Sequence, residues 1–204
     1  MRKDSVAVIA LVRHAQSTSN AQGLVAGRSD AQLTELGTRQ ARALAPWLVG
    51  ASRLWTSPLL RARQTAALAV PHLEATLKEN FIELDYGDFE GASAQVEPGV
   101  GWRALENRHD EAFAGGESLA ELDRRVAKEL DALLEDDASE MHSPDQHLVI
   151  VSHVSPIKSA LTWALGIPGN VAWRMRLDNA SLTLIGERGG RAYLYRYNAV
   201  PDSA

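Results

Sequence analysis

Two uninterrupted apolar runs stand out in the chain, one over residues 6–12 and one over residues 148–151. Neither run alternates with polar residues. Apolar runs of this length are typical of strands covered on both faces, as in a parallel sheet between helices. Shorter extended segments are predicted over residues 53–56 and 73–82. The pattern therefore predicts several buried strands of one sheet.

Helical spacing of apolar residues predicts the elements between these strands. Over residues 35–49, four apolar positions recur at i, i+3, i+4 and i+7, which is the period of an amphipathic helix. Ser57 and Pro58 are typical of an N-cap and a first helical position, so a second helix is predicted from there to about Val70. Three more helices are predicted over residues 101–111, 117–135 and 156–165, the last one ended by Gly166.

Two further apolar segments near the C-terminus flank a pair of glycines. Residues 182–185 and 192–195 have the composition of strands, and the glycines at 189–190 between them predict a β-hairpin. Because strands otherwise alternate with helices, the sequence predicts an α/β fold, a three-layer sandwich with a mostly parallel central sheet flanked by helices. The irregular region 84–145 is interpreted as an insertion over one end of that sheet, and it is a candidate lid.

Composition narrows the class of protein. The 204 residues suit one domain, residues 1–204, that can bury a core without disulfide bonds. The chain has no cysteine, which excludes thiolate metal sites and cysteine nucleophiles and fits a reducing compartment. A net charge of −5 argues against a sequence-independent nucleic-acid binder. The first apolar run is too short to span a membrane and has no signal-peptide cleavage site, so a cytoplasmic location is expected.

Basic and imidazole side chains are predicted to meet at one edge of the sheet. Arg13 and His14 end the first strand, His153 ends a later one, and Arg61 falls in the first turn of the helix that follows another. Ligands of open α/β sheets bind beyond the carboxyl ends of the strands, where these residues would converge. Two arginines and two histidines there predict a pocket for a compact anion such as phosphate. Taken singly, each has a more ordinary explanation, as a solvated strand end, a core histidine or a surface charge.

A metal site is the main alternative at this edge, because two histidines and a carboxylate form a familiar ligand set. However, two arginines in the same shell would repel a divalent cation. The chain also has no H-E-x-x-H motif and no aspartate cluster. The expectation is therefore a site without metal or other cofactor.

A series of motifs runs in order through nearly the whole chain. They are L-V-R-H-A-Q-S at 11–17, G-R-S-D-A-Q-L-T-E-L-G at 27–37, S-P-L-L-R-A-R-Q-T-A at 57–66, E-L-D-Y-G-D-F-E-G at 83–91, G-G-E-S at 115–118 and V-S-H at 151–153. Together they resemble the motifs of the histidine phosphatase superfamily, also called the phosphoglycerate mutase-like family. The order of the motifs makes this resemblance specific, whereas the R-H-x tripeptide alone would be weak.

The resemblance implies a phosphoglycerate mutase-like fold and six site residues. His14 would be the nucleophile that accepts the phosphoryl group, and Glu83 would be the general acid and base. The residues expected to hold the phosphate are Arg13, Asn20, Arg61 and a protonated His153. Ala15 and Val154 stand where the family commonly has glycine. Because both add a side chain beside the phosphate pocket, a reshaped pocket with retained chemistry is expected.

The resemblance favours a phosphomonoester hydrolase that acts on a small phosphorylated metabolite through a phosphohistidine. Only 70 residues separate Glu83 from His153, and cofactor-dependent mutases of the family have a longer segment there. Mutase-type phosphoryl transfer and non-catalytic phosphate binding stay open as alternatives. A homodimer is suggested by the family alone. The candidates for leaving-group contacts in the insertion are Trp102, Arg103, Arg108, His109 and Phe113, although packing or solvent exposure explains each of them better when taken singly.

Overall fold

A computed structural model of the chain describes residues 8–93, 109–136, 147–188 and 191–202. The described strands are β1 Val8–Arg13, β2 Ala51–Thr56, β3 Thr76–Leu77, β4 His147–Ser152, β5 Leu182–Arg188 and β6 Arg191–Ala199. They form one six-stranded sheet with the order β3-β2-β4-β1-β5-β6. The pairs β1–β4, β2–β4 and β2–β3 are parallel, and the pairs β1–β5 and β5–β6 are antiparallel. The predicted mostly parallel sheet and the strands of the terminal hairpin are confirmed.

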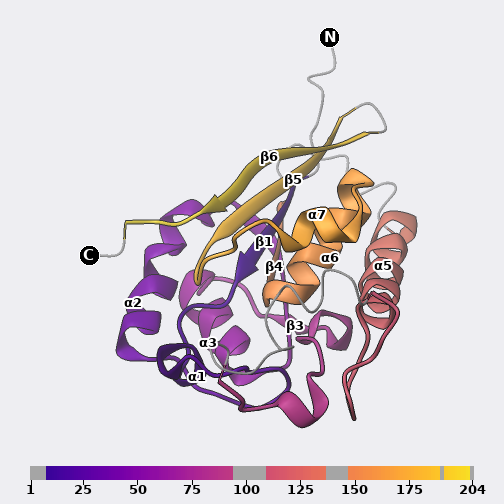
Figure 1. Ribbon diagram of the computed structural model, residues 1–204. Coiled ribbons are helices and arrows are strands. Elements are labelled where there is room, and N and C mark those ends of the chain that lie inside the picture. Colours follow the sequence, from indigo (N-terminus) through magenta and orange to yellow (C-terminus); the bar gives the residue numbers. More distant parts are fainter. Residues whose placement is uncertain (1–7, 94–108, 137–146, 189–190, 203–204) are drawn as a thin grey trace.

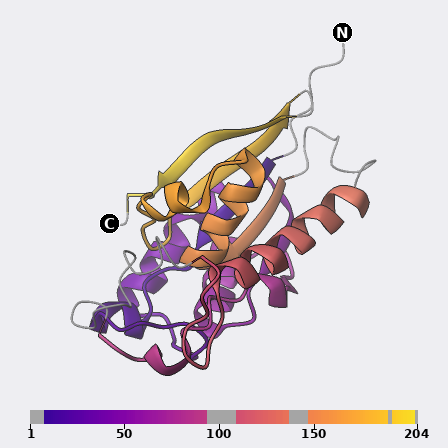
Figure 2. The same cartoon turned by 45° about the vertical axis from the view of Figure 1, so that its right-hand side comes forward.

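Helices lie on both sides of this sheet and give the predicted three-layer α/β arrangement (Figures 1 and 2). The described α-helices are α1 Thr18–Gln22, α2 Glu35–Ala43, α3 Leu60–Ala69, α5 Leu119–Asp136, α6 Val154–Leu165 and α7 Gly169–Trp173. α2 and α3 pack together on one face, and α5 and α6 pack together on the other. Among the described residues, no helix is long and apolar enough to cross a membrane.

The apolar run of β1 shows why both faces need a helical layer. Ile9 and Leu11 belong to the core under α5 and α6, whereas Ala10 and Val12 belong to the core under α2 and α3. Successive residues of a strand point to opposite faces, so an unbroken apolar run supplies both cores at once. The prediction that this run is a strand covered on both faces is confirmed.

Two predicted helix boundaries were wrong, each for an identifiable reason. The helix expected over residues 35–49 ends as an α-helix at Ala43, and a 3-10 turn follows at Ala45–Trp47. Pro46 lies in that turn; it has no N–H to donate and its ring is poorly accommodated inside an α-helix. The next helix begins at Leu60 and has Leu59 at its N-cap position, where Ser57 was predicted. The Ser57 hydroxyl instead lies 2.7 Å from His153 Nε2. The end of α6 is confirmed, since Gly166 stops it in the left-handed conformation with φ of 60°.

The region 84–145 only partly matches the predicted insertion over one end of the sheet. Within it, α5 is a core helix, because Leu122, Val126 and Leu130 are buried against the sheet and α6. This helix is therefore part of a structural layer and is not a lid. Residues 94–108 and 137–146 lie outside the described residues, as do Trp102, Arg103 and Arg108 and most of the helix predicted over 101–111.

Candidate active site

The carboxyl ends of β1, β2 and β4 meet at one edge of the sheet, as expected for the site. The backbone N–H of His14 donates to Ser152 O at 2.8 Å, and the N–H of Ser57 donates to Val151 O at 3.0 Å. These bonds continue the parallel pairing by one residue past each strand. His14 and His153 therefore emerge side by side, with ring centroids 5.0 Å apart.

The His14 ring is held in one orientation by its two nitrogens. Nδ1 lies 2.8 Å from Ala15 O, so this nitrogen carries the proton and donates to the carbonyl. Nε2 then has its lone pair free to accept, and Arg61 Nε donates to it at 3.3 Å. Burial lowers the pKa of His14 well below its usual value, and the positive charges of Arg61 and Arg13 lower it further. These effects favour a neutral imidazole whose Nε2 lone pair faces Arg61, so a nucleophilic role of Nε2 requires that this hydrogen bond is given up.

Arg61 is almost completely buried although it carries a charge, with 1% of its surface exposed. Its Nη2 donates to Ala26 O at 3.1 Å and to Gly27 O at 2.7 Å, and its Nη1 donates to Ser29 O at 2.8 Å. The loop around Gly27 thus fixes the guanidinium while its Nε stays directed at His14. This arrangement places a fixed positive charge next to His14.

Arg13 comes from the last position of β1 and is oriented by the segment before β5. Its Nη1 donates to Leu177 O at 2.5 Å. Its Nε is buried and has no hydrogen-bond partner among the described residues. Burial lowers the pKa of Arg13, and the nearby Glu83 and Asp178 carboxylates oppose that shift. An arginine with an unpaired buried donor beside His14 suits an anionic ligand.

His153 contacts Ser57 and faces the His14 ring, and its protonation stays a prediction for the phosphate-bound state. Its Nε2 lies 2.7 Å from Ser57 Oγ, and its Nδ1 is buried with no partner among the described residues. Burial lowers the pKa of His153 well below its usual value, and the charges of Arg61 and Arg13 and the His14 ring lower it further. Both effects favour the neutral imidazole. A bound dianion would favour its protonated form.

Asn20 lines the site with its amide held by donors on one side. Its Oδ1 accepts from Ser17 N at 3.1 Å and from Asn179 Nδ2 at 3.0 Å. Asn179 Nδ2 also donates to His14 O at 3.1 Å. Because Oδ1 is taken by these donors, Nδ2 of Asn20 is the group available to a ligand. Sequence reasoning missed Asn179, since an asparagine before a strand carries no specific signal.

Glu83 is buried, with 5% of its surface exposed, and reaches the same space from the segment after β3. Its Oε1 accepts from its neighbour Leu84 N at 2.8 Å and from Ser155 N, at the start of α6, at 3.2 Å. Both bonds reach Oε1, so Oε2 is the oxygen oriented for a substrate. The structure therefore brings the predicted acid and base to the same pocket as His14.

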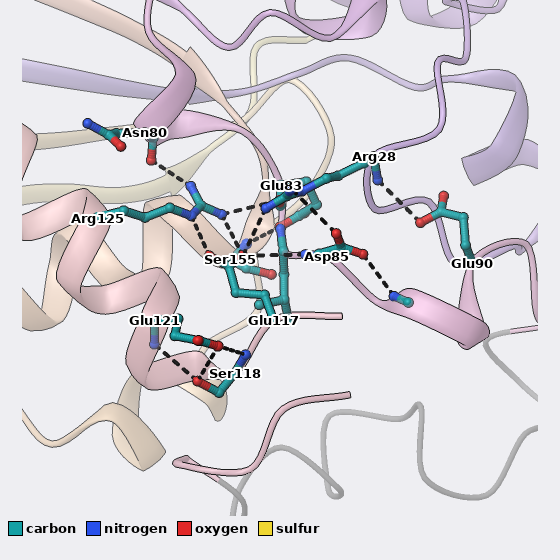
Figure 3. Close-up of polar contacts among 12 residues, drawn as sticks. Arg28, Asn80, Glu83, Asp85, Glu90, Glu117, Ser118, Glu121, Arg125 and Ser155 are labelled. Atoms are coloured by element: carbon teal, nitrogen blue, oxygen red, sulfur yellow. Dashed lines mark hydrogen bonds and ion pairs between the residues drawn. The ribbon is translucent and has the colours of Figure 1, made fainter. Parts of the chain in front are cut away.

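An ion pair from α5 supports the segment that carries Glu83. Figure 3 shows Arg125 at the centre of this network. Arg125 Nε donates to Glu117 Oε1 at 2.7 Å, and Nη2 donates to Glu117 Oε2 at 3.0 Å. Nη1 donates to the backbone carbonyl of Asn80 at 2.6 Å, and Nη2 also donates to that of Glu83 at 3.2 Å. Glu117 N in turn donates to Asp85 O at 2.9 Å. The G-G-E-S motif thus supplies the counter-ion that holds the Glu83 segment.

Removing this support should cost substantial stability. Arg125→Met is expected to lower the free energy of unfolding by about 3 kcal/mol, because the Glu117 carboxylate, with 11% of its side chain exposed, would keep only the longer contact with Arg28 at 3.6 Å as an ion pair. Urea unfolding followed by circular dichroism would measure the change. Arg176→Met is the control, since Arg176 is 84% exposed in its pair with Asp178 and its loss should cost under about 1 kcal/mol. Equal effects of the two variants would contradict the role of Arg125.

Four of the six predicted residues, Arg13, His14, Asn20 and Glu83, line a cavity of about 360 Å³, whereas Arg61 and His153 lie behind the His14 ring and are not part of its lining. Its described lining consists of Arg13, His14, Asn20, Gly23, Leu24, Val25, Ala26, Glu83, Tyr86, Val154 and Asn179. Charged and polar side chains thus share the lining with the mainly apolar 23–26 segment, Tyr86 and Val154. Phe113 packs on Tyr86 with ring centroids 5.3 Å apart but is not among the lining residues. This volume suits a small metabolite.

The part of the chain that the structure describes contains no group of three or more His, Asp or Glu side chains placed to hold a metal ion. Metal independence stays a prediction that needs its own measurement.

Known proteins resemble this chain in sequence and in fold. A family model described as the histidine phosphatase superfamily (branch 1) matches residues 9–200. The chain is 32% identical over 199 residues to phosphoserine phosphatase 1 of Hydrogenobacter thermophilus, covering 92% of this chain and 90% of that protein. A solved structure of mycobacterial glucosyl-3-phosphoglycerate phosphatase superposes with a TM-score of 0.82 at 26% identity, covering 95% and 99% of the two chains.

The chain spans about half the length of other relatives that it matches. It is 32% identical over 183 residues to a bifunctional protein of Mycobacterium tuberculosis, and the match covers 85% of this chain but 48% of that protein.

Proposed function

This chain belongs to the histidine phosphatase superfamily, and on that premise we propose that it hydrolyses small phosphate monoesters through a phosphohistidine on His14, without a metal ion. The observation that carries the proposal is the state of His14: a buried, neutral ring with Nδ1 held by Ala15 O and Nε2 beside the Arg61 guanidinium. The similar proteins named above act, by their names, on phosphoserine and on glucosyl-3-phosphoglycerate. Both are small phosphorylated metabolites.

In the proposed reaction, Nε2 of His14 attacks phosphorus in line with the ester oxygen. The new N–P bond forms as the P–O bond to the alcohol breaks, which divides one difficult displacement into two steps. Because Nδ1–H already donates to Ala15 O, the positive charge that develops on the ring is stabilised without movement. Water then attacks the phosphohistidine and releases inorganic phosphate.

The phosphate oxygens would be held by the groups that surround His14. Arg13 offers the unpaired Nε, Asn20 offers Nδ2, and Arg61 offers the Nε–H that points at the nucleophile. His153 would join them in its protonated form, because a bound dianion raises its pKa. Fixed positive groups of this kind stabilise the charge on the transferring phosphoryl group, a role that magnesium ions have in kinases.

Glu83 would supply and remove the protons. Its carboxyl group would protonate the leaving alcohol in the first step and would take a proton from the attacking water in the second. Its fixed position supports this role, since Oε1 is held by Leu84 N and Ser155 N while Oε2 is available to the substrate.

Hydrolysis and mutase-type transfer are separated by a direct assay. The purified protein should release inorganic phosphate from p-nitrophenyl phosphate and from small phosphate monoesters, and it should interconvert 3- and 2-phosphoglycerate much more slowly than it hydrolyses its preferred substrate. Addition of EDTA should leave the rate unchanged, because the charge on the phosphoryl group is neutralised by arginines. Faster interconversion than hydrolysis would favour a mutase. Loss of activity in EDTA with recovery on adding a divalent metal would contradict the metal-independent mechanism.

A further inference from the structure

A half-buried carboxylate outside the pocket holds the loop that positions Arg61. Glu90 accepts hydrogen bonds from three successive backbone amides: Gly27 N reaches Oε1 at 3.0 Å and Oε2 at 2.9 Å, and Arg28 N and Ser29 N lie at 3.2 Å. The Ser29 hydroxyl donates to the same carboxylate. Figure 3 shows the contact between Arg28 and Glu90. Successive amides that converge on one anion form a backbone nest, and here Glu90 fills it.

Arg61 binds the opposite side of the same peptide groups. The peptide between Ala26 and Gly27 gives its N–H to Glu90 and its C=O to Arg61, at 3.1 Å. The peptide between Gly27 and Arg28 does the same, with its C=O 2.7 Å from Arg61 Nη2. Two whole peptide groups therefore connect the carboxylate to the guanidinium. Their dipoles are aligned so that the negative charge faces the N–H ends and the positive charge faces the C=O ends.

The loop has little freedom to hold Arg61 in any other way. Gly27 is buried, and a Cβ there would come within 2.6 Å of Glu90 Oε2 and of Leu84 O. Asp30 Oδ1 also accepts from Leu60 N at 2.6 Å, which ties the loop to the first turn of α3, where Arg61 begins its side chain. The loop, the helix and the carboxylate thus form one unit with the guanidinium between them and His14.

We infer that Glu90 is a positioning residue for Arg61, acting through the two peptide groups between Ala26 and Arg28. Neither Glu90 nor Arg61 is among the described residues that line the cavity, but Arg61 Nε donates to His14 Nε2, which does line it, and Glu90 contacts only the loop on the far side of Arg61. The inference rests on the proposed function in one respect: it takes Arg61 as a phosphate-binding group. These contacts connect Glu90 to the site although its side chain does not line the cavity.

Glu90→Gln tests this role with little change in volume. One carboxylate oxygen becomes an NH₂ donor that faces amide donors, so the loop should shift and carry the guanidinium with it. A displacement of about 1 Å in a positioned group can cost about 100-fold in rate. We expect kcat/KM for p-nitrophenyl phosphate to fall about 10- to 100-fold. The dissociation constant of inorganic phosphate, measured by calorimetry, should rise in the same variant.

A double-mutant cycle with Arg61→Ala separates positioning from general damage. If Glu90 acts through Arg61, then Glu90→Gln should change kcat/KM and phosphate affinity less than about 2-fold in the Arg61→Ala background. The same fold loss in both backgrounds would overturn the inference. Glu121→Gln is the matched control, since its carboxylate also accepts from a backbone amide and a serine hydroxyl, those of Ser118, and it should leave both quantities unchanged.

Two further measurements distinguish a loss of folding, a failure of the proposed function and a failure of the role of Glu90. Thermal unfolding shows whether Glu90→Gln folds; if it does not, Ser29→Ala removes one hydroxyl contact to Glu90, and its smaller loss should also vanish in the Arg61→Ala background. If the unmodified protein binds phosphate but hydrolyses no monoester, the proposed function fails, while the cycle on phosphate affinity still decides the role of Glu90. If the unmodified protein hydrolyses monoesters and the losses are additive, only the role of Glu90 fails.

Discussion

Replacing His14 with alanine is expected to reduce phosphatase activity by on the order of 10⁴-fold or more, because the variant has no atom that can form the covalent intermediate. The other groups around the phosphate would stay in place, so phosphate binding should persist. Steady-state hydrolysis of p-nitrophenyl phosphate measures the first effect, and calorimetry with inorganic phosphate measures the second. A loss of rate with retained binding would separate the nucleophile from the groups that only hold the anion.

Rapid quenching with ³²P-labelled substrate tests the same residue from the protein side. The unmodified protein should carry label in an acid-labile, alkali-stable form, and His14→Ala should carry none. His72→Ala is the control, since His72 is an exposed histidine whose Nε2 lies 3.3 Å from Ala51 O, away from the cavity. Turnover by His14→Ala near the level of the unmodified protein would exclude His14 as the nucleophile.

Glu83→Gln should have an effect that depends on the leaving group. For an alkyl phosphate, kcat/KM should fall by about 10² to 10⁴-fold, because the alkoxide can no longer leave as an alcohol. For p-nitrophenyl phosphate the loss should be under about 10-fold, because p-nitrophenolate leaves without a proton. The ratio kcat/KM is the quantity to compare, since it covers only the steps up to formation of the phosphohistidine. The second role of Glu83, as the base for water, does not enter it.

The base role has its own signature in the same variant. With p-nitrophenyl phosphate, Glu83→Gln should release a burst of p-nitrophenolate followed by slow turnover, as phosphohistidine forms and then waits for water. Glu79→Gln, at an exposed position on the same segment, should behave like the unmodified protein. Equal losses of kcat/KM on the two substrates would contradict the general-acid role of Glu83.

The residues that follow strands were the predictable part of the site. An apolar run that ends at a basic or imidazole residue indicates a buried strand and the point where that strand leaves the core. Arg13, His14 and His153 could therefore be placed at one edge of the sheet from the sequence. The order of the motifs added Asn20 and Glu83. Neither of these follows a regular strand end, so periodicity alone would not have found them.

What the sequence could not predict are contacts that depend on side-chain partners far along the chain. Serine is a common N-cap residue, but the Ser57 hydroxyl lies 2.7 Å from His153 Nε2, and the helix starts only at Leu60. Arg125 has the spacing of an ordinary exposed helix residue, but it holds Glu117 and the Glu83 segment. No local pattern distinguishes such residues from solvated ones, because the partner is fixed only when the layers assemble.

The position of β1 in the sheet has a consequence for the way the protein is made. Its neighbours on both sides, β4 and β5, come from the last third of the chain. At ribosomal rates of about 5–20 residues per second, the apolar run over Val8–Arg13 stays without either partner for on the order of ten seconds. During this time the apolar strand of the nascent chain is unpaired. His14, the predicted nucleophile at the end of β1, comes to lie beside His153 only after β4 has been made.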